Sequence, residues 1–238
     1  MRADQLLVER GLAASRSQAQ RLIAVGVTWR SSPLAPWRRV AKNGDELPSF
    51  AELQLLDDAE SRYVSRGGLK LEGALRSSGW SVQGLRCLDV GQSTGGFTDC
   101  LLQQGAAQVV GVDVGHGQLH ERLRADPRVV CVEHCNARTL SPDDARLPGA
   151  AQGFDVIVGD VSFISLTLIL PVLQPLLTSS GRLLLLVKPQ FELQPSDIGK
   201  GGLVRDAASY VRVESRVLEA CADLNVDVVG FWESVITG

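Results

Sequence analysis

Six short apolar runs alternate with helical stretches from residue 86 onward, and no other feature of the sequence constrains the fold as strongly. Each run is rich in Val, Leu and Ile, which is the pattern of strands that are buried on both faces. Such runs alternating with helices predict an α/β fold with a mostly parallel, doubly wound sheet. The predicted strands are 86–90, 108–113, 129–133, 154–160, 182–187 and 226–232.

The first sixty residues follow a different pattern, which predicts a separate small domain. Apolar residues at helical spacing indicate two helices, the second of them capped by Ser15, and residues 51–56 alternate like a strand. The periodicity lapses just after this strand. We therefore expect a small α+β domain over residues 1–58, a linker over 59–66 and the α/β domain over 67–238.

The net charge of −3 conceals an uneven distribution of charge. Residues 1–42 carry eight Arg or Lys against two acids, whereas residues 43–60 carry six acids and no base. A basic block followed by an acidic one indicates a small domain with one positive face, as in many nucleic-acid-binding modules.

The sequence gives little support for a membrane protein, a secreted protein or a metal-binding site. No stretch of 18 or more uncharged apolar residues occurs and the N-terminus is polar, so we expect a cytoplasmic protein. The five cysteines indicate buried thiols. Cys131, His134 and Cys135 lack an evident fourth ligand, and the pair His116 and His120 fits a solvated face, so no metal is expected.

A glycine-rich turn follows the first apolar run. Asp89 lies at the end of the run, one residue before its last, and Gly91, Gly95 and Gly96 precede a predicted helix. A nucleotide-like ligand sits at this point of a doubly wound sheet, because glycine admits a close backbone approach and the helix N-terminus offers free N–H groups. Asp113 ends the next run, where a carboxylate can accept both hydroxyls of a ribose.

The spacing of these glycines favours an adenosine cofactor that lacks phosphates. The order is G-x-x-x-G-G rather than G-x-G-x-x-G, and no phosphate-binding lysine follows, so S-adenosylmethionine fits better than a dinucleotide or ATP. A turn that serves packing alone is the alternative, and Asn136 could equally be a turn residue. The residues expected at the cofactor are Asp89, Gly91, Ser93, Thr94, Gly95, Gly96, Phe97, Asp113, Asn136 and Asp160.

Three charged residues are candidates for chemistry at the sheet edge. Asp160 and Lys188 end the fourth and fifth runs, and Lys70 lies near the start of the α/β domain. The chain has four lysines against twenty arginines, and lysine is the one of the two that can accept a proton. The alternative, purely structural roles are an ion pair for Asp160, a cation that extends to the solvent for Lys188 and a helix-surface lysine for Lys70.

Four further segments are informative together, namely 65–71, 88–98, 159–165 and 187–192. In sequence and in order they resemble the TlyA family of hemolysin A-like proteins, which are understood as ribosomal RNA 2'-O-methyltransferases. The resemblance implies a Rossmann-like class I methyltransferase fold with an FtsJ-like domain, S-adenosylmethionine as cofactor and ribosomal RNA or ribosomal subunits as partner. It also implies cytidine as the modified nucleotide.

The first sixty residues resemble the S4-like RNA-binding domain of a small-subunit ribosomal protein. The resemblance runs through Asp4, Leu7, Gly11, Ala19 and Ile23, among others. The arginines that we expect to contact RNA are Arg2, Arg16, Arg21, Arg38 and Arg39.

A Lys-Asp-Lys-Glu tetrad serves methyl transfer in this family, and three of its members match Lys70, Asp160 and Lys188. The family's glutamate follows a segment like 234–238, so Glu233 is not assigned to it, and we expect the C-terminal strand beside 226–232 to be missing as well. A neutral Lys188 would take the proton of the ribose hydroxyl while Asp160 holds the lysine in place.

Three alternatives remain open beside this reading. A non-catalytic RNA-binding or ribosome-assembly factor that keeps the cofactor pocket gains weight from the unmatched glutamate. A small-molecule methyltransferase is disfavoured by the basic domain. A hemolysin-like protein would need an amphipathic or spanning segment, which the sequence does not show.

Overall fold

The computed structural model describes residues 1–56, 62–199, 204–206 and 208–236. The chain divides into two compact units, Met1–Leu69 and Lys70–Gly238. The predicted linker begins among residues 57–61, which lie outside the described residues, so the predicted domain bounds stay a prediction.

The first unit packs two helices against a small antiparallel sheet. Gln18 N donates to Ser15 Oγ over 3.3 Å, as expected of the residue that caps the second helix. Apolar side chains from both helices and the first strand, among them Leu6, Leu22 and Val27, form the core. The elements are α1 (Ala3–Glu9), α2 (Arg16–Gly26), β1 (Val27–Arg30), β2 (Arg38–Arg39) and β3 (Glu52–Leu55), with the strands in the order β2-β1-β3.

A five-stranded sheet forms the centre of the second unit, and all of its strand pairs are parallel. The order is β6-β5-β4-β7-β8, so the chain winds outward from β4 in one direction and from β7 in the other. The α/β prediction with a doubly wound sheet is confirmed. The strands are β4 (Arg86–Val90), β5 (Gln108–Val112), β6 (Val129–Val132), β7 (Phe154–Gly159) and β8 (Leu177–Leu185).

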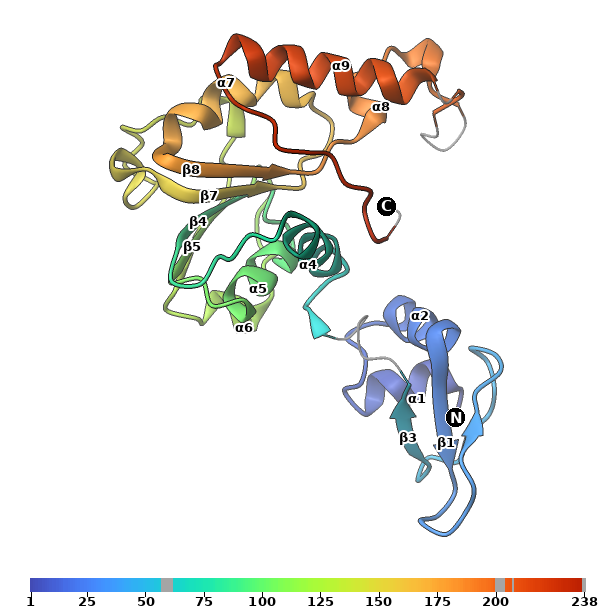
Figure 1. Cartoon of the computed structure of the whole chain (residues 1–238). Helices are drawn as coiled ribbons and strands as arrows, with labels where there is room; N and C mark the ends of the chain where they lie inside the picture. The colour runs from blue at the N-terminus through green and yellow to red at the C-terminus, as the bar shows by residue number, and fades with distance from the viewer. Residues whose placement is uncertain (57–61, 200–203, 207, 237–238) are drawn as a thin grey trace. The chain divides into compact units, whose positions relative to one another are not determined.

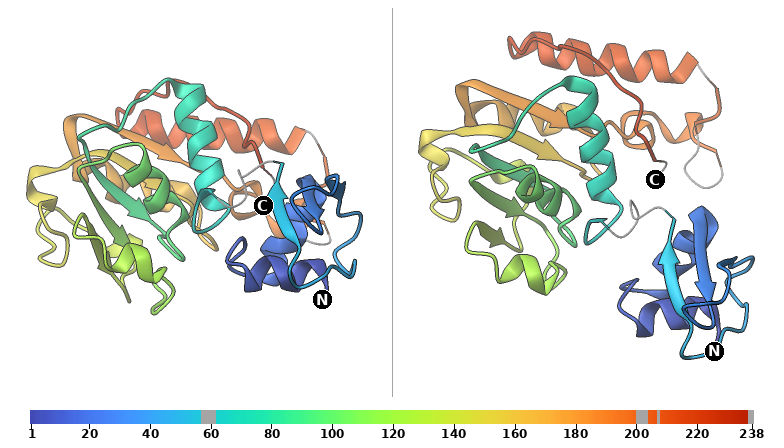
Figure 2. Two further views of the ribbon diagram at one scale, coloured as in Figure 1. Left: turned by 90° about the horizontal axis from the view of Figure 1, so that it is seen from below. Right: turned by 60° about the horizontal axis from the view of Figure 1, so that its bottom comes forward.

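Helices cover both faces of this sheet (Figure 1). One face carries α4 (Gly67–Ser78), α5 (Gly96–Gln103) and α6 (Glu121–Arg124). The other carries α7 (Leu170–Leu173) and α9 (Ala208–Asp223), and Figure 2 shows the same layers from two further directions. The short α8 (Pro189–Glu192) follows β8.

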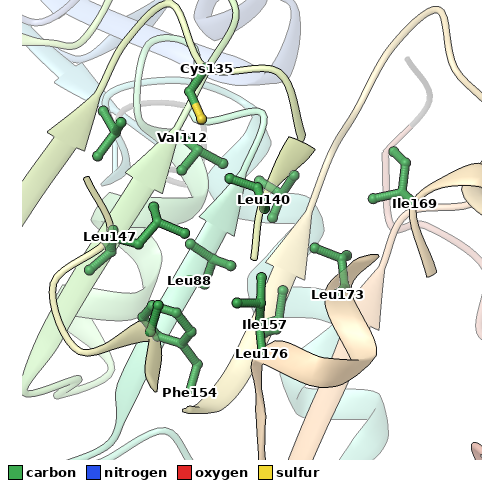
Figure 3. Packing of buried hydrophobic residues seen from close by; sticks show 14 residues of the cluster. Leu88, Val112, Cys135, Leu140, Leu147, Phe154, Ile157, Ile169, Leu173 and Leu176 are labelled. Atoms are coloured by element: carbon green, nitrogen blue, oxygen red, sulfur yellow. The ribbon is translucent and has the colours of Figure 1, made fainter. Parts of the chain in front are cut away.

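Apolar side chains between the sheet and its covering segments form the larger core (Figure 3). Leu88, Phe154 and Ile157 from the central strands are fully buried against Leu173 and Leu176. Strands that bury both faces need no polar alternation, which explains why apolar residues occur at successive positions in them. This core fixes the central strands, and their carboxyl ends together form one edge of the sheet.

The sixth predicted strand, residues 226–232, is wrong. The segment forms no strand, and side chains such as Val229 and Trp232 are exposed. Its residues favour a strand locally, but a strand also requires a neighbour, and no segment in the described part of the chain pairs with it. The outer edge of β8 is likewise unpaired among the described strands.

The other five strands form where the apolar runs predict them. Four agree with the prediction to within one residue at each end, whereas β8 begins at Leu177 rather than at 182. Residues 178–180 are polar, so the sequence does not predict the start of this strand. In the structure Leu177 pairs with Phe154, before the register shift between Phe154 and Val156.

Candidate active site

Two lysines share one aspartate at the carboxyl-end edge of the sheet. Asp160 directly follows β7, Lys188 follows β8, and Lys70 lies in the first turns of α4. Lys70 Nζ lies 2.9 Å from Asp160 Oδ2, and Lys188 Nζ lies 2.7 Å from Asp160 Oδ1. The structure thus brings together the three residues that the sequence analysis selected for chemistry.

The carboxylate of this trio is held in its ionised form. Burial acts to raise the pKa of Asp160, but the hydrogen bonds from Lys188 and Lys70 outweigh it, so the pKa lies below its ordinary value. The side chains of Lys70 and Lys188 are 15% and 18% exposed, which leaves the cluster within reach of a ligand.

The glycine-rich turn lies against the same trio. Gly91 has a φ of 84°, and a Cβ on it would lie 3.3 Å from the backbone oxygen of Asp160. Gly95, at φ 97°, precedes the first residue of α5. Both positions need glycine, since other residues rarely adopt this conformation. At Gly91 the backbone of the turn, which lies next to Asp160, therefore carries no side chain that would cover it.

Asp113 ties the loop after β5 to this turn. Its Oδ2 accepts from Ser93 N and its Oδ1 accepts from Gly115 N, each over 2.7 Å. A carboxylate oxygen can accept more than one hydrogen bond, so both oxygens retain capacity for a ligand hydroxyl. Ser93 and Thr94 are exposed beside it, whereas Gly96 and Phe97 are buried in α5.

Asp89 lies beneath the turn rather than on its surface. It is fully buried, and Thr98 Oγ1 donates to its Oδ2 over 2.6 Å. Gln92 Nε2 in turn donates to Thr98 Oγ1 over 2.9 Å. Asp89 Oδ1 and Gln92 Oε1 have no hydrogen-bond partner among the described residues. Burial raises the pKa of Asp89 to about 7, so near neutral pH the group can hold a proton.

Gln92 also supports the turn, although it was not among the residues predicted for the site. The Gln92 side chain packs directly against Gly111 and occupies the position that a Gly111 side chain would take. A Cβ on Gly111 would lie 2.0 Å from Gln92 Cδ. A glycine inside the apolar run 108–113 was the available signal, because it marks a close approach by another group.

Replacement of Asp89 by Asn should change how stability depends on pH. Between about pH 4 and pH 7 the folded protein keeps a proton on Asp89 that the unfolded chain has lost, so this group's contribution to the free energy of unfolding falls as pH rises. Asn lacks that proton. In urea unfolding, the stability of Asp89→Asn relative to wild type should therefore rise by up to about 1.4 kcal/mol per pH unit and level off above pH 7.

A companion variant sharpens this test. Thr98→Val removes the hydroxyl that favours ionised Asp89, so the decline in stability should extend further above pH 7. A pH-independent difference between Asp89→Asn and wild type would contradict the assignment.

The remaining polar candidates make local contacts. Asn136 Oδ1 accepts from Arg138 N over 3.0 Å, and the place of Asn136 at the cofactor stays a prediction. His116 stacks on His134 with ring centroids 4.7 Å apart, and His120 Nδ1 accepts from Arg122 N. Within the described ranges, no three or more His, Cys, Asp or Glu side chains are placed to hold a metal ion.

The five candidate arginines differ in what they contact. Arg2 and Arg16 both bond to buried Asp4, over 3.0 and 3.1 Å. Hydrogen bonding, from Arg2 above all, holds the pKa of Asp4 well below its usual range. Arg21 is partly buried in α2, whereas Arg38 and Arg39 are exposed on β2. The β2 pair is the better placed for an external partner.

Two aromatic rings and a serine beside the trio had no role in the sequence analysis. Phe163 is 91% exposed at a φ of 65°, and its ring lies 5.4 Å from that of Phe191. Lys188 Nζ lies 6.0 Å from the Phe191 ring centroid and 2.6 Å from Ser162 Oγ. These residues lie in the segments that resemble the family, but only the three-dimensional structure places them at the lysine.

Comparison with known proteins gives one consistent group of relatives. The sequence profile described as FtsJ-like methyltransferase matches residues 63–238. YqxC of Bacillus subtilis is 44% identical over 237 residues, which cover 100% of this chain and 81% of the relative. TlyA of Mycobacterium tuberculosis is 42% identical over 237 residues, which cover 100% of this chain and 85% of the relative. That relative is described as a 16S/23S rRNA (cytidine-2'-O)-methyltransferase.

A solved Streptococcus thermophilus structure that carries the hemolysin name covers 100% of this chain. The two are 40% identical, the match covers 83% of the solved chain, and the TM-score is 0.73. Among the described residues, no helix is both long enough and apolar enough to cross a membrane.

Proposed function

Since the chain belongs to the TlyA family of FtsJ-like methyltransferases, we propose that it methylates the ribose 2'-oxygen of cytidine in ribosomal RNA, with S-adenosylmethionine as the methyl donor. The observation that carries the proposal is the Lys70–Asp160–Lys188 trio beside the glycine-rich turn. The name of the Mycobacterium tuberculosis relative supports both ribosomal RNA and cytidine. Because ribosomes are its substrate, we propose that the enzyme acts in the cytoplasm.

The residues around the turn fit S-adenosylmethionine. Gly91 keeps the turn free of a side chain beside Asp160, and Asp113 has lone pairs for the two ribose hydroxyls. Buried Asp89 supports the turn from below. When bound, the cofactor supplies an electrophilic methyl group on a sulfonium. Turn and trio adjoin at Gly91 and Asp160, so the methyl acceptor would be held at the lysines.

The trio supplies the acid–base chemistry that a ribose hydroxyl requires. This hydroxyl is a weak acid, and its oxygen becomes a competent nucleophile as it loses its proton. Lys188, once unprotonated, takes that proton, while Asp160 fixes the position of the lysine. Lys70 forms an ion pair with the other carboxylate oxygen, Oδ2, of Asp160. Much of the rate enhancement would come from alignment of the acceptor oxygen with the methyl group.

The exposed aromatic pair supports a nucleotide as the acceptor. Unpaired RNA bases stack on aromatic side chains, and Phe163 presents 91% of its surface next to Lys188 and Phe191. A base stacked there would bring its ribose to the lysine.

We further propose that the first unit is an S4-like RNA-binding domain that uses the β2 arginines. Arg38→Gln with Arg39→Gln should weaken RNA binding and lower the slope of log affinity against log salt by about 1 to 2, because fewer counterions are released. Filter binding over a range of salt concentrations measures both effects.

A matched control for this pair is Arg128→Gln. Arg128 is an exposed arginine that immediately precedes β6 and bonds to Asp126, at the sheet edge opposite to the trio. Its replacement should leave the salt slope unchanged. An unchanged slope for the β2 double variant would remove these arginines from the RNA interface.

Assays of methyl transfer on intact ribosomal subunits, naked ribosomal RNA and a panel of small hydroxyl compounds test the proposed function. Transfer to one of the two RNA substrates supports it. Cofactor binding without transfer to any acceptor would instead favour the non-catalytic ribosome-assembly factor.

A further inference from the structure

Ser162 lies against the lysine that we place at the reacting hydroxyl. Ser162 Oγ is 2.6 Å from Lys188 Nζ, which also lies 2.7 Å from Asp160 Oδ1 and 3.4 Å from the backbone oxygen of Asp160. The loop after β7 thus supplies all three of these contacts to the amine.

Ser162 is also the most accessible polar member of the cluster. Its side chain is exposed, whereas those of Lys188 and Asp160 are 18% and 21% exposed. Ser162 directly precedes the exposed ring of Phe163. A ribose presented beside that ring would therefore reach the serine hydroxyl at least as readily as the amine.

The three contacts of Lys188 differ in whether they can donate a proton. The Asp160 carboxylate and the backbone oxygen only accept hydrogen bonds, so each requires an N–H of the lysine. A hydroxyl donates and accepts at the same time. When Lys188 is neutral, Ser162 is therefore the one of these three contacts that can donate to the nitrogen lone pair.

We propose that Ser162 is a catalytic residue that relays the proton of the ribose hydroxyl to Lys188. The proposal rests on the function proposed above. The ribose O–H proton passes to Ser162 Oγ as the serine proton passes to Lys188 Nζ, which becomes an ammonium. The freed electron pair of the ribose oxygen forms the bond to the methyl carbon, and the electron pair of the broken carbon–sulfur bond stays on the sulfur of the donor.

Two substitutions at this position separate the hydroxyl from the rest of the side chain. Ser162→Ala should slow single-turnover methyl transfer to ribosomal RNA by about 100-fold, in the range for loss of one proton-transfer group. Ser162→Thr keeps the hydroxyl and should stay within about tenfold of wild type. Because the site is exposed, both variants should fold, with cofactor and RNA affinities within a few fold of wild type. Ser141→Ala, at another exposed serine, is the control and should leave the rate unchanged.

A proton inventory distinguishes a relay from simple positioning of the lysine. Rates in H2O/D2O mixtures should follow a curved dependence for wild type, since two protons move together, and a linear one for Ser162→Ala. A near wild-type rate for Ser162→Ala would overturn the relay. So would a slow Ser162→Ala variant combined with a linear inventory for wild type, which would make Ser162 a positioning residue. Failure of wild type to transfer methyl groups would overturn the proposed function together with the relay, whereas active wild type with an unaffected Ser162→Ala variant overturns the relay alone.

Discussion

Replacing Lys188 with alanine is expected to lower the rate of methyl transfer by about 100- to 10,000-fold, the usual range for loss of a general base. Lys188 is the member of the trio that contacts both Asp160 and Ser162. Cofactor affinity should change far less than the rate, since most of the proposed cofactor residues follow β4 and β5, although Lys188 contacts one of them, Asp160. Single-turnover transfer from a labelled cofactor measures the rate, and calorimetry measures the affinity.

A conservative variant separates charge from basicity at this position. Lys188→Arg keeps the positive charge beside Asp160 but cannot give up a proton near neutral pH, so it should be nearly as slow as Lys188→Ala. Arg128→Ala, at an exposed arginine that bonds to Asp126, should leave the rate unchanged. Loss of folding and of RNA binding together in Lys188→Ala would show that the lysine is structural and that the mechanism is wrong.

Replacing Asp113 with alanine is expected to weaken S-adenosylmethionine binding by about 100-fold. Hydrogen bonds to a charged group contribute about 1.5 to 3 kcal/mol each, and the carboxylate would accept two ribose hydroxyls. The same change frees Ser93 N and Gly115 N, which loosens the turn that holds the cofactor. Calorimetric titration with the cofactor measures the affinity, and a melting curve reports whether the fold is retained.

Glu133 provides a matched control for Asp113. It is also a carboxylate at a strand end, and it accepts from Gly117 N in the same loop and from Arg124. Glu133→Gln should keep cofactor affinity within about threefold of wild type. Equal affinities of Asp113→Ala and wild type would remove Asp113 from the cofactor site.

The sequence predicted most of the sheet because the signal for a doubly buried strand is local. Residues 86–90 and 154–160 are short runs with apolar residues at most of their central positions, and they form β4 and β7 nearly as predicted. Residues 226–232 carry the same local signal but form no strand, since pairing depends on a neighbour that the run itself does not reveal. The polar start of β8 was missed for the complementary reason, because its pairing with Phe154 overrides its composition.

The candidate site was predictable where topology alone determines it. Asp160 and Lys188 end strands of one parallel sheet, so their juxtaposition follows from the rule that such ends share an edge. Gly111 indicated a close approach by another group, but the sequence does not identify Gln92 as that group. The role proposed for Ser162 was not predictable, since it depends on the path of the loop after β7. The burial of Asp89 likewise depends on how α5 covers the turn, which strand periodicity does not report.

The most direct test of the account is to locate the transferred methyl group. The protein is incubated with ribosomal subunits and methyl-labelled S-adenosylmethionine, the RNA is digested to nucleosides, and the labelled nucleoside is identified by mass spectrometry. The account predicts label in 2'-O-methylcytidine, at a rate that collapses in Lys188→Ala. Label on a base, or no label in RNA from a folded protein that binds the cofactor, would contradict it.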